Sequence, residues 1–367
     1  MNRLPMLENI FAQPASHRTL LDYHAGQGST SLQTCGERLR NASGRLIYSG
    51  MGASIFAVIP AVSRLLENGY PAQIAESSEL LHYGSASLTK EDVGILISRS
   101  GESVEVVRLA EKMREAGMTV IGVTNVPGSP LEQLADHTLT IGSQADQLIA
   151  VQTYTGTVLT LLLLAEEAIS GSSLEFSQAA SAMLPQLSAH IDACFEASES
   201  WRHWLEPSGV LYLLGRGPAL ASVQEGALLM HETAKASAVG MSSGQFRHGP
   251  VEWVSAESRV LVFGAPEATQ AIDRSLANDL YRMGAQVRWI GPSQGGSDSG
   301  EHAPALIPWP DVAPAFAPVF DVVPMQVASY RLALWRGIVP GDFRYASEIT
   351  SAESGFPLFQ SRHTSKE

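Results

Sequence analysis

The chain has 367 residues, and its 24 Lys and Arg against 37 Asp and Glu give a formal charge of −13. This acidic balance, without any basic run, argues against nucleic acid as a partner, because clustered Lys and Arg supply the affinity for phosphate backbones. With 45% apolar and 17% charged residues the composition is that of a globular protein, and the length predicts two domains of ordinary size.

The cysteines and the apolar stretches point to the cell interior. Two cysteines, Cys35 and Cys194, cannot stabilise a chain of this length through disulfides, which fits a reducing compartment. The N-terminus lacks a basic start followed by an apolar core, and the longest apolar stretch near a helix, 161–165, is far shorter than the ~20 residues of a membrane span. We therefore expect a cytoplasmic protein with no membrane partner.

In chain order, a helical N-terminal stretch leads into strand-and-helix units. Each short apolar run ends in a turn rich in Gly or Ser, and an amphipathic pattern follows the turn. In the first half the predicted strands are 44–49, 93–98 and 118–123, the turns are 50–54 and 99–103, and the helices run from 55 to 66 and over 104–116. Strands that alternate with long helices predict crossover connections and a parallel sheet.

A long helical region over 151–205, broken near Gly171, precedes a second series of the same kind. Its predicted strands are 210–214, 259–264 and 286–290, its helices are 219–236 and 319–335, and the Gly- and Ser-rich stretch 291–300 is a surface loop. The predicted fold class is therefore α/β, with two similar doubly wound halves joined by helices.

The first chemically informative segment is Ser98-Arg99-Ser100-Gly101-Glu102-Ser103, at an expected strand-to-helix turn. Ligands bind at such carboxyl ends of strands in open parallel sheets. Three hydroxyls, a glycine that allows close backbone approach and the free N–H groups of a helix N-terminus suit a phosphate monoester. The serines could instead simply cap the helix, and Arg99 could either contact the anion or point to solvent.

Several cofactor motifs are incomplete. Gly50-Met51-Gly52 and Gly215-Arg216-Gly217 begin like dinucleotide fingerprints, but Ile55 and Leu220 occupy the third glycine position, and no Walker lysine pattern occurs. His231-Glu232-Thr233-Ala234-Lys235 lacks the second histidine of a zinc-protease helix. The sequence therefore predicts no cofactor and no metal.

Glu232 and His248 are the candidate acid–base residues. Glu232 lies in a largely apolar helix, and partial burial there would raise its pKa toward the range in which a general base works at neutral pH. Alternatively, an exposed Glu232 pairs with Lys235 three residues on. His248 lies between an arginine and a Gly-Pro breaker, and a positioned histidine can donate or accept a proton near neutrality.

Taken together, these segments resemble the sugar isomerase (SIS) family, in particular the isomerase half of glucosamine-6-phosphate synthase and the related deglycases and deaminases. The resemblance spans nearly the whole chain. In the first half the matching stretches are 8–14 (ENIFAQP), 98–103 (SRSGES) and 125–129 (NVPGS). In the second half they are 214–217 (LGRG), 225–228 (EGAL), Glu232, 248–250 (HGP) and Pro324-Met325-Gln326 with Tyr330.

The resemblance implies two tandem SIS domains, each a three-layer α/β/α unit around a doubly wound parallel sheet. The implied divisions are an N-terminal helical segment at 1–43, a first, phosphosugar-binding domain at 44–170, connecting helices at 171–205, a second domain at 206–345, and a C-terminal tail near the active site at 346–367. It also implies a homodimer whose active site lies at the subunit interface.

The resemblance also implies a role for each candidate residue. Glu232 would move a proton between C1 and C2 of the sugar, and His248 would assist ring opening from the neighbouring subunit. The positions implied to bind a sugar 6-phosphate are Gly52, Ala53, Ser54, Ser98, Arg99, Ser100, Ser103, Val151, Thr153 and Ser347. Proton transfer by one carboxylate needs no metal or organic cofactor.

The sequence lacks two lysines that the family has at its active site. Leu229 stands where the family has a lysine three residues before the base, and Ser347 stands where a second lysine engages the sugar carbonyl. The glutamine-hydrolysing half is absent from the 367 residues, so we expect no glutaminase activity.

Our leading hypothesis is an enzyme of the deglycase or deaminase type that acts on an amino-sugar or sugar-amine 6-phosphate. The alternatives are plain aldose–ketose isomerisation, and a protein that binds or senses a phosphosugar without turnover.

Overall fold

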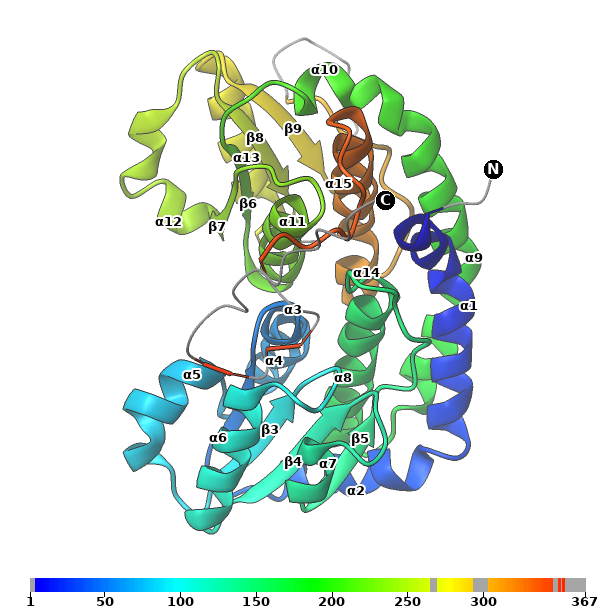
Figure 1. The fold of residues 1–367 in the computed structure, drawn as a ribbon, viewed down its shortest axis with the longest axis vertical. Helices are drawn as coiled ribbons and strands as arrows, with labels where there is room; N and C mark the ends of the chain where they lie inside the picture. The colour runs from blue at the N-terminus through cyan, green and yellow to red at the C-terminus, as the bar shows by residue number, and fades with distance from the viewer. Residues whose placement is uncertain (1–3, 265–268, 293–302, 346–348, 351, 354–367) are drawn as a thin grey trace, which may run out of the picture.

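Two parallel β-sheets, each covered by helices on both faces, form two lobes (Figure 1). The computed structural model describes residues 4–264, 269–292, 303–345, 349–350 and 352–353. Both lobes have the three-layer α/β/α architecture that the sequence predicts. The predicted surface loop at 291–300 lies almost entirely outside the described residues.

The first sheet has five parallel strands in the order β2-β1-β3-β4-β5. The strands are β1 (Leu46–Gly50), β2 (Ala72–Glu76), β3 (Val93–Ile97), β4 (Thr119–Thr124) and β5 (His137–Thr140). Every residue of β1 and β3 is buried, as expected for parallel strands covered on both faces. The strand order reverses between β1 and β3, so the chain leaves these two neighbouring strands in opposite directions along the sheet.

The second sheet has four parallel strands in the order β7-β6-β8-β9. They are β6 (Leu211–Gly215), β7 (Ala238–Ser242), β8 (Arg259–Phe263) and β9 (Gln286–Ile290). Its order also reverses, between β6 and β8, so the two lobes repeat one plan. The predicted strands of both halves are confirmed to within about two residues, while β2, β5 and β7 were not predicted.

Helices connect the strands and join the lobes. Those around the first sheet are α3 (Ala53–Phe56), α4 (Ile59–Glu67), α5 (Ser77–Glu79), α6 (Val104–Glu115) and α7 (Pro130–Leu134). Those around the second sheet are α11 (Leu220–Glu232), α12 (Ser243–Phe246), α13 (Gln270–Arg282), α14 (Ala317–Asp321) and α15 (Val323–Trp335). The remaining helices are α1 (Pro5–Ala25), α2 (Ser29–Arg40), α8 (Gln152–Ser170), α9 (Leu174–Ala197) and α10 (Arg202–Leu205). The break near Gly171 is confirmed, because this residue ends α8 in a left-handed conformation that glycine adopts easily.

Helices α1 and α9 run side by side past both lobes (Figure 1). The buried side chain of Gln13, on α1, donates to the Gln326 side chain of α15 at 2.9 Å and accepts from the Thr155 hydroxyl of α8 at 2.8 Å. A buried amide needs such partners, because an unpaired one costs free energy. This network links α1 and α8 to α15 of the second lobe.

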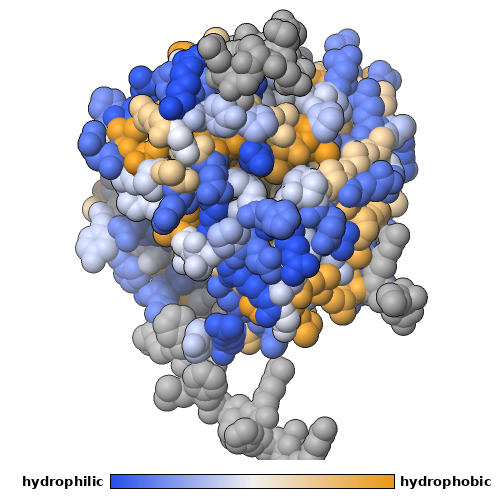
Figure 2. Space-filling model, turned by 90° about the horizontal axis from the view of Figure 1, so that it is seen from above, coloured by the Kyte–Doolittle hydropathy of each residue, from blue (hydrophilic) through white to orange (hydrophobic). Residues whose placement is uncertain are grey.

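The surface seen in Figure 2 mixes hydrophilic residues with smaller groups of apolar ones. Among the residues that the structure describes, no helix combines the length and the apolar character needed to cross a bilayer.

Candidate functional site

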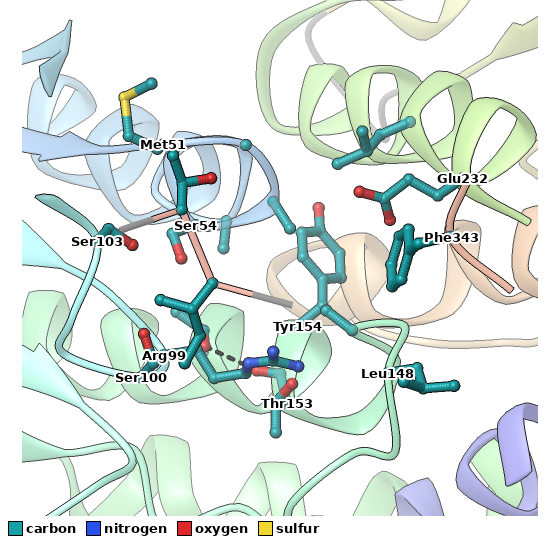
Figure 3. Close-up of a pocket in the computed structure, with 18 residues that line it drawn as sticks. Met51, Ser54, Arg99, Ser100, Ser103, Leu148, Thr153, Tyr154, Glu232 and Phe343 are labelled. Atoms are coloured by element: carbon teal, nitrogen blue, oxygen red, sulfur yellow. Dashed lines mark hydrogen bonds between the residues drawn. The ribbon is translucent and has the colours of Figure 1, made fainter. Parts of the chain in front are cut away.

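A cavity of about 260 Å³ lies where α3 of the first lobe meets α11 of the second (Figure 3). It opens beside the carboxyl ends of β1 and β3, where the strand order reverses and ligands bind in open α/β sheets. The lining residues are Met51, Gly52, Ala53, Ser54, Ala57, Arg99, Ser100, Ser103, Leu148, Ala150, Thr153, Tyr154, Thr157, Leu228, Glu232, Phe343, Ile349 and Thr350.

The loop after β3 builds one end of this cavity. The buried Ser98 hydroxyl accepts from the Gly101 amide at 3.1 Å and lies 3.1 Å from the Ser103 hydroxyl, while the Ser100 hydroxyl accepts from the Glu102 amide at 3.2 Å. Ser103 precedes the first residue of α6, yet its side chain makes no capping hydrogen bond. Ser100 and Ser103 line the cavity instead, so simple helix capping does not explain these hydroxyls.

The loop after β1 and the Arg99 side chain complete this polar end. Gly52 has a φ of +52°, which lets the backbone turn from β1 into α3 and present Ala53 and Ser54 to the cavity. Arg99 lines the cavity as well and is half-buried, with its guanidinium near Thr153 in the view of Figure 3. Of the two orientations considered for Arg99, the structure has the one that faces the site.

Thr153 is positioned by Asp146, a residue that the sequence analysis missed. The Asp146 carboxylate accepts from the backbone amides of Val151 and Thr153, each at 2.9 Å, and from the Thr153 hydroxyl. These amides begin α8 and lack partners within the helix, so Asp146 serves as its cap. An Asp a few residues ahead of a helix is the sequence signal that could have indicated this role.

Glu232 enters the cavity from α11, opposite the serine loop. The side chain is half-buried, and burial raises the pKa of its carboxyl to about 6, against the opposing charges of Lys235 and Arg99. Lys235 donates to the backbone carbonyl of Glu232, and these two described side chains form no ion pair with each other. The alternative of an exposed Glu232 paired with Lys235 is therefore wrong.

Tyr154 and two acids lie behind the Glu232 end. The Tyr154 and Glu225 side chains are both buried, and the Tyr154 hydroxyl and one Glu225 oxygen have no hydrogen-bond partner. Burial raises the Glu225 pKa well above its usual value, and the nearby charges of Glu232 and Asp146 raise it further. Asp321 lies close to Tyr154 as well, and its pKa is raised to about 8, mainly by burial. Burial therefore favours the protonated form of both acids behind this end of the cavity.

The C-terminal segment covers part of the opening. Phe343, Ile349 and Thr350 line the cavity, and the Thr350 carbonyl accepts from the Val104 amide at 3.2 Å, at the start of α6. Glu353, three residues further on, pairs with Arg108 at 2.9 Å and with His82 at 3.0 Å. The described part of the predicted tail thus lies against the predicted phosphate loop.

The predicted site residues therefore fall into four groups. Those that line the cavity are Gly52, Ala53, Ser54, Arg99, Ser100, Ser103, Thr153 and Glu232. Ser98 and Val151 are buried beside it and support the loop and the α8 N-terminus, respectively. His248 is exposed and does not line this cavity, and Ser347 lies outside the described residues.

Other lining residues were not identified from the sequence, most notably Tyr154, Leu148 and Phe343. Tyr154 directly follows the predicted Thr153, but α8 is buried on almost all sides, so no periodicity indicates which face meets the cavity. Leu148 and Phe343 come from irregular segments whose path no local pattern predicts.

At the corresponding edge of the second sheet, an ion pair lies after β6. Arg216, after β6, donates to the fully buried Asp273 side chain at 3.0 Å, and the Thr269 hydroxyl donates to the same carboxylate at 3.0 Å. Over the described residues, no group of three or more His, Cys, Asp or Glu side chains is arranged to hold a metal.

This architecture and site define a class: a two-lobed α/β protein with a cavity built by the switch-point loops of one sheet and a carboxylate from the other lobe. Residues 38–166 match the family model described as SIS domain. The chain thus contains a SIS domain, and its two parallel sheets fit a tandem arrangement of such domains.

Similarity to known proteins extends well beyond the matched domain. The chain is 29% identical over 353 residues to the isomerizing glutamine–fructose-6-phosphate aminotransferase of Pyrobaculum aerophilum, covering 95% of this chain but only 57% of that relative. Its fold resembles the C-terminal domain of glucosamine-fructose-6-phosphate aminotransferase from Francisella tularensis, with a TM-score of 0.78, 18% identity and coverage of 92% and 97% of the two chains. It also resembles glucosamine-6-phosphate deaminase from Thermotoga maritima, with a TM-score of 0.73, 18% identity and coverage of 94% and 99%.

Proposed function

We propose that this protein is a phosphosugar enzyme of the deglycase or deaminase type, acting on an amino-sugar or sugar-amine 6-phosphate. One observation carries the proposal: a single cavity has the hydroxyls of Ser100 and Ser103 at one end and the half-buried Glu232 carboxyl at the other. Hydroxyls beside a helix N-terminus suit an anion, and a carboxyl of raised pKa suits a general base. The names of similar proteins refer to fructose 6-phosphate and to glucosamine 6-phosphate, and both support a hexose 6-phosphate or its amino derivative as substrate.

The polar end would bind the phosphate group. Ser100, Ser103 and Ser54 supply hydroxyl donors, and Arg99 adds a charge-assisted contact to a dianionic ester. The left-handed Gly101 turns the loop so that the backbone of this segment can lie close to the ligand. The phosphate would hold the sugar with its reactive carbons toward Glu232.

Glu232 would then carry out the proton transfer. In a ketose with an amine attached at C1, the carboxylate takes a proton from C1 while O2 gains a proton from water, which gives the 1,2-enaminol, and the carboxyl then gives its proton to C2. The product is an imine at C1, which water hydrolyses to the aldose 6-phosphate and the free amine. One carboxylate suffices for both transfers, and the absence of lysine at Leu229 does not obstruct them.

The proposed base has a defined pH dependence. Because only the ionised carboxyl of Glu232 accepts a proton, and its pKa is raised to about 6, kcat/KM should fall as the pH drops through that value. His248 would assist ring opening from a second copy of the chain in a homodimer, as the family resemblance implies; in this copy it is exposed and does not line the cavity.

The test is turnover of a panel of fructosamine 6-phosphates and hexosamine 6-phosphates by the wild type and by Glu232→Gln. We expect the substitution to lower kcat roughly 10²- to 10⁴-fold, the range typical of a general base, while the Kd for the substrate stays nearly constant. Glu206→Gln, which alters an exposed carboxyl paired with Arg202, is the matched control and should keep full activity.

The products distinguish the three candidate functions of this site. Release of an aldose phosphate and an amine supports the proposal, and interconversion of plain aldose and ketose phosphates without amine release supports an isomerase. Saturable binding without turnover over the whole panel supports a sensor. Full activity of Glu232→Gln would refute the assignment of the base.

A further inference from the structure

The end of the helix that carries Glu232 has an unusual residue. Lys235 has a φ of +50°, and among the described residues only Leu148 is another non-glycine residue with a positive φ. The Ala236 amide donates back to the Met230 carbonyl at 3.0 Å, so the chain reverses at Lys235 to close α11. Helices often end across a left-handed residue of this kind, and glycine is usual there because a Cβ is unfavourable in that conformation.

The lysine side chain explains why this position does not hold glycine. The Lys235 ammonium donates to the backbone carbonyl of Glu232, one of the carbonyls that the helix end leaves without a partner. It also lies 5.6 Å from the centre of the Phe343 ring, within the range of a cation–π contact. Both contacted residues line the cavity. The side chain of Lys235 thus links the helix end that carries Glu232 to Phe343 of the C-terminal segment.

We propose that Lys235 is a positioning residue: it fixes the end of the helix beside Glu232, holds Phe343 against the cavity, and places its ammonium charge beside the helix end that carries the base. This inference rests on the proposed function, because it assigns a partner to the proposed base.

The charges around the pair agree with this role. Glu232 is faced by Lys235, by Arg99 from the loop after β3 and by Glu225 from its own helix. Burial raises the Glu232 pKa, and of the two cations that lower it, Lys235 has a larger effect than Arg99. Lys235 in turn is faced by Asp342 and Arg344, and burial lowers its pKa while Asp342 and Glu232 favour its charged form. Removal of Lys235 should therefore make Glu232 easier to protonate.

The experiment compares Lys235→Gly, Lys235→Met and Lys235→Arg with the wild type. Glycine relieves the left-handed strain, so Lys235→Gly should keep the Tm or raise it by about 1–3 °C. The same variant should lose about threefold to tenfold in kcat/KM at pH 5.5 and much less at pH 8, because the low-pH limb moves to higher pH. Lys235→Met should show the same change of profile, and Lys235→Arg, which keeps the charge, should restore most of the wild-type profile.

A matched control separates this effect from a general loss of positive charge. Arg344 lies near Lys235 but is not among the charges that act on Glu232, so Arg344→Met should leave the profile unchanged. An unchanged low-pH limb in both Lys235→Gly and Lys235→Met would overturn the inference, and so would a limb that moves equally in Lys235→Arg.

A second readout does not depend on turnover. Carboxyl ¹³C NMR, with the Glu232 signal assigned by its loss in Glu232→Gln, follows the titration of Glu232 directly. A higher midpoint in Lys235→Gly than in the wild type supports the inference, and equal midpoints refute it. If the wild type turns over no sugar phosphate, the proposed function fails, while this titration still decides the role of Lys235.

Discussion

Gly101 offers the sharpest test of how the predicted phosphate loop is built. Its φ is +68°, its amide donates to the Ser98 carbonyl at 3.0 Å and to the Ser98 hydroxyl at 3.1 Å, and its carbonyl accepts from the Leu131 amide at 3.0 Å. A Cβ at this position would lie 2.1 Å from the Ser129 hydroxyl oxygen and 2.4 Å from the Ser129 Cβ. Gly101→Ala therefore meets two independent penalties.

The magnitudes of the two penalties can be separated. A left-handed alanine costs about 1–2 kcal/mol, and forcing extra volume into a packed site costs about 1–3 kcal/mol more, so Gly101→Ala should lower the free energy of unfolding by about 2–5 kcal/mol. Gly128→Ala is the matched control, because its φ is +75° and a Cβ there would meet nothing within 4 Å. This control should lose only the conformational part, about 1–2 kcal/mol.

Urea unfolding followed by circular dichroism measures both losses, provided that the m-value stays constant. Adding Ser129→Gly to Gly101→Ala removes both atoms of the clash and should recover part of the packing loss. Affinity for a hexose 6-phosphate should fall in Gly101→Ala and stay unchanged in Gly128→Ala. Equal destabilisation by the two alanines, or no rescue by Ser129→Gly, would refute the packing argument.

Two buried carboxyls give opposite pH dependences of stability. Hydrogen bonds from Arg45 hold the pKa of Asp92 well below its usual range, so its stabilisation is present above about pH 4 and is lost at lower pH. Asp92→Asn should cost about 2–4 kcal/mol at pH 7 and somewhat less at pH 3, where the carboxyl of the unfolded chain is mostly protonated, and a loss that does not change with pH would contradict this. Burial raises the pKa of Asp321 to about 8, so the folded state keeps this proton and wild-type stability should fall as the pH rises from about 4 to 8. Asp321→Asn should flatten that slope in urea midpoints measured at pH 5 and pH 8, and an unaltered slope would show that Asp321 does not titrate in this way.

The central strands could be predicted from the sequence because each is a short apolar run that ends in a turn rich in Gly or Ser. Val93–Ile97 is an uninterrupted buried run followed by Ser and Gly, and the structure has β3 and the start of α6 within a residue of the prediction. The missed strands β2, β5 and β7 are all at sheet edges, where one side has no neighbouring strand. Ala72–Glu76 is only partly buried, so its composition carries no strong strand signal.

The candidate site was predictable in its residue types and less so in its geometry. Local order and spacing pointed to the serine loop and to Glu232, which lie in one cavity although they are more than a hundred residues apart. The inward turn of Ser98 depends on the hydrogen bond from Gly101, and the contribution of Phe343 depends on the path of an irregular segment. Both follow from tertiary contacts, which a linear pattern does not contain.

The buried contact between Gln13 and Gln326 bears on how the molecule is made. During synthesis the first helix leaves the ribosome long before its partner, 313 positions later in the chain, has been translated. Until then the Gln13 side chain can bond Ile10 and Thr155 but lacks Gln326, so this part of the nascent N-terminal lobe cannot reach its final packing. We therefore expect the two lobes to complete folding together, after translation ends, and to unfold in one cooperative step.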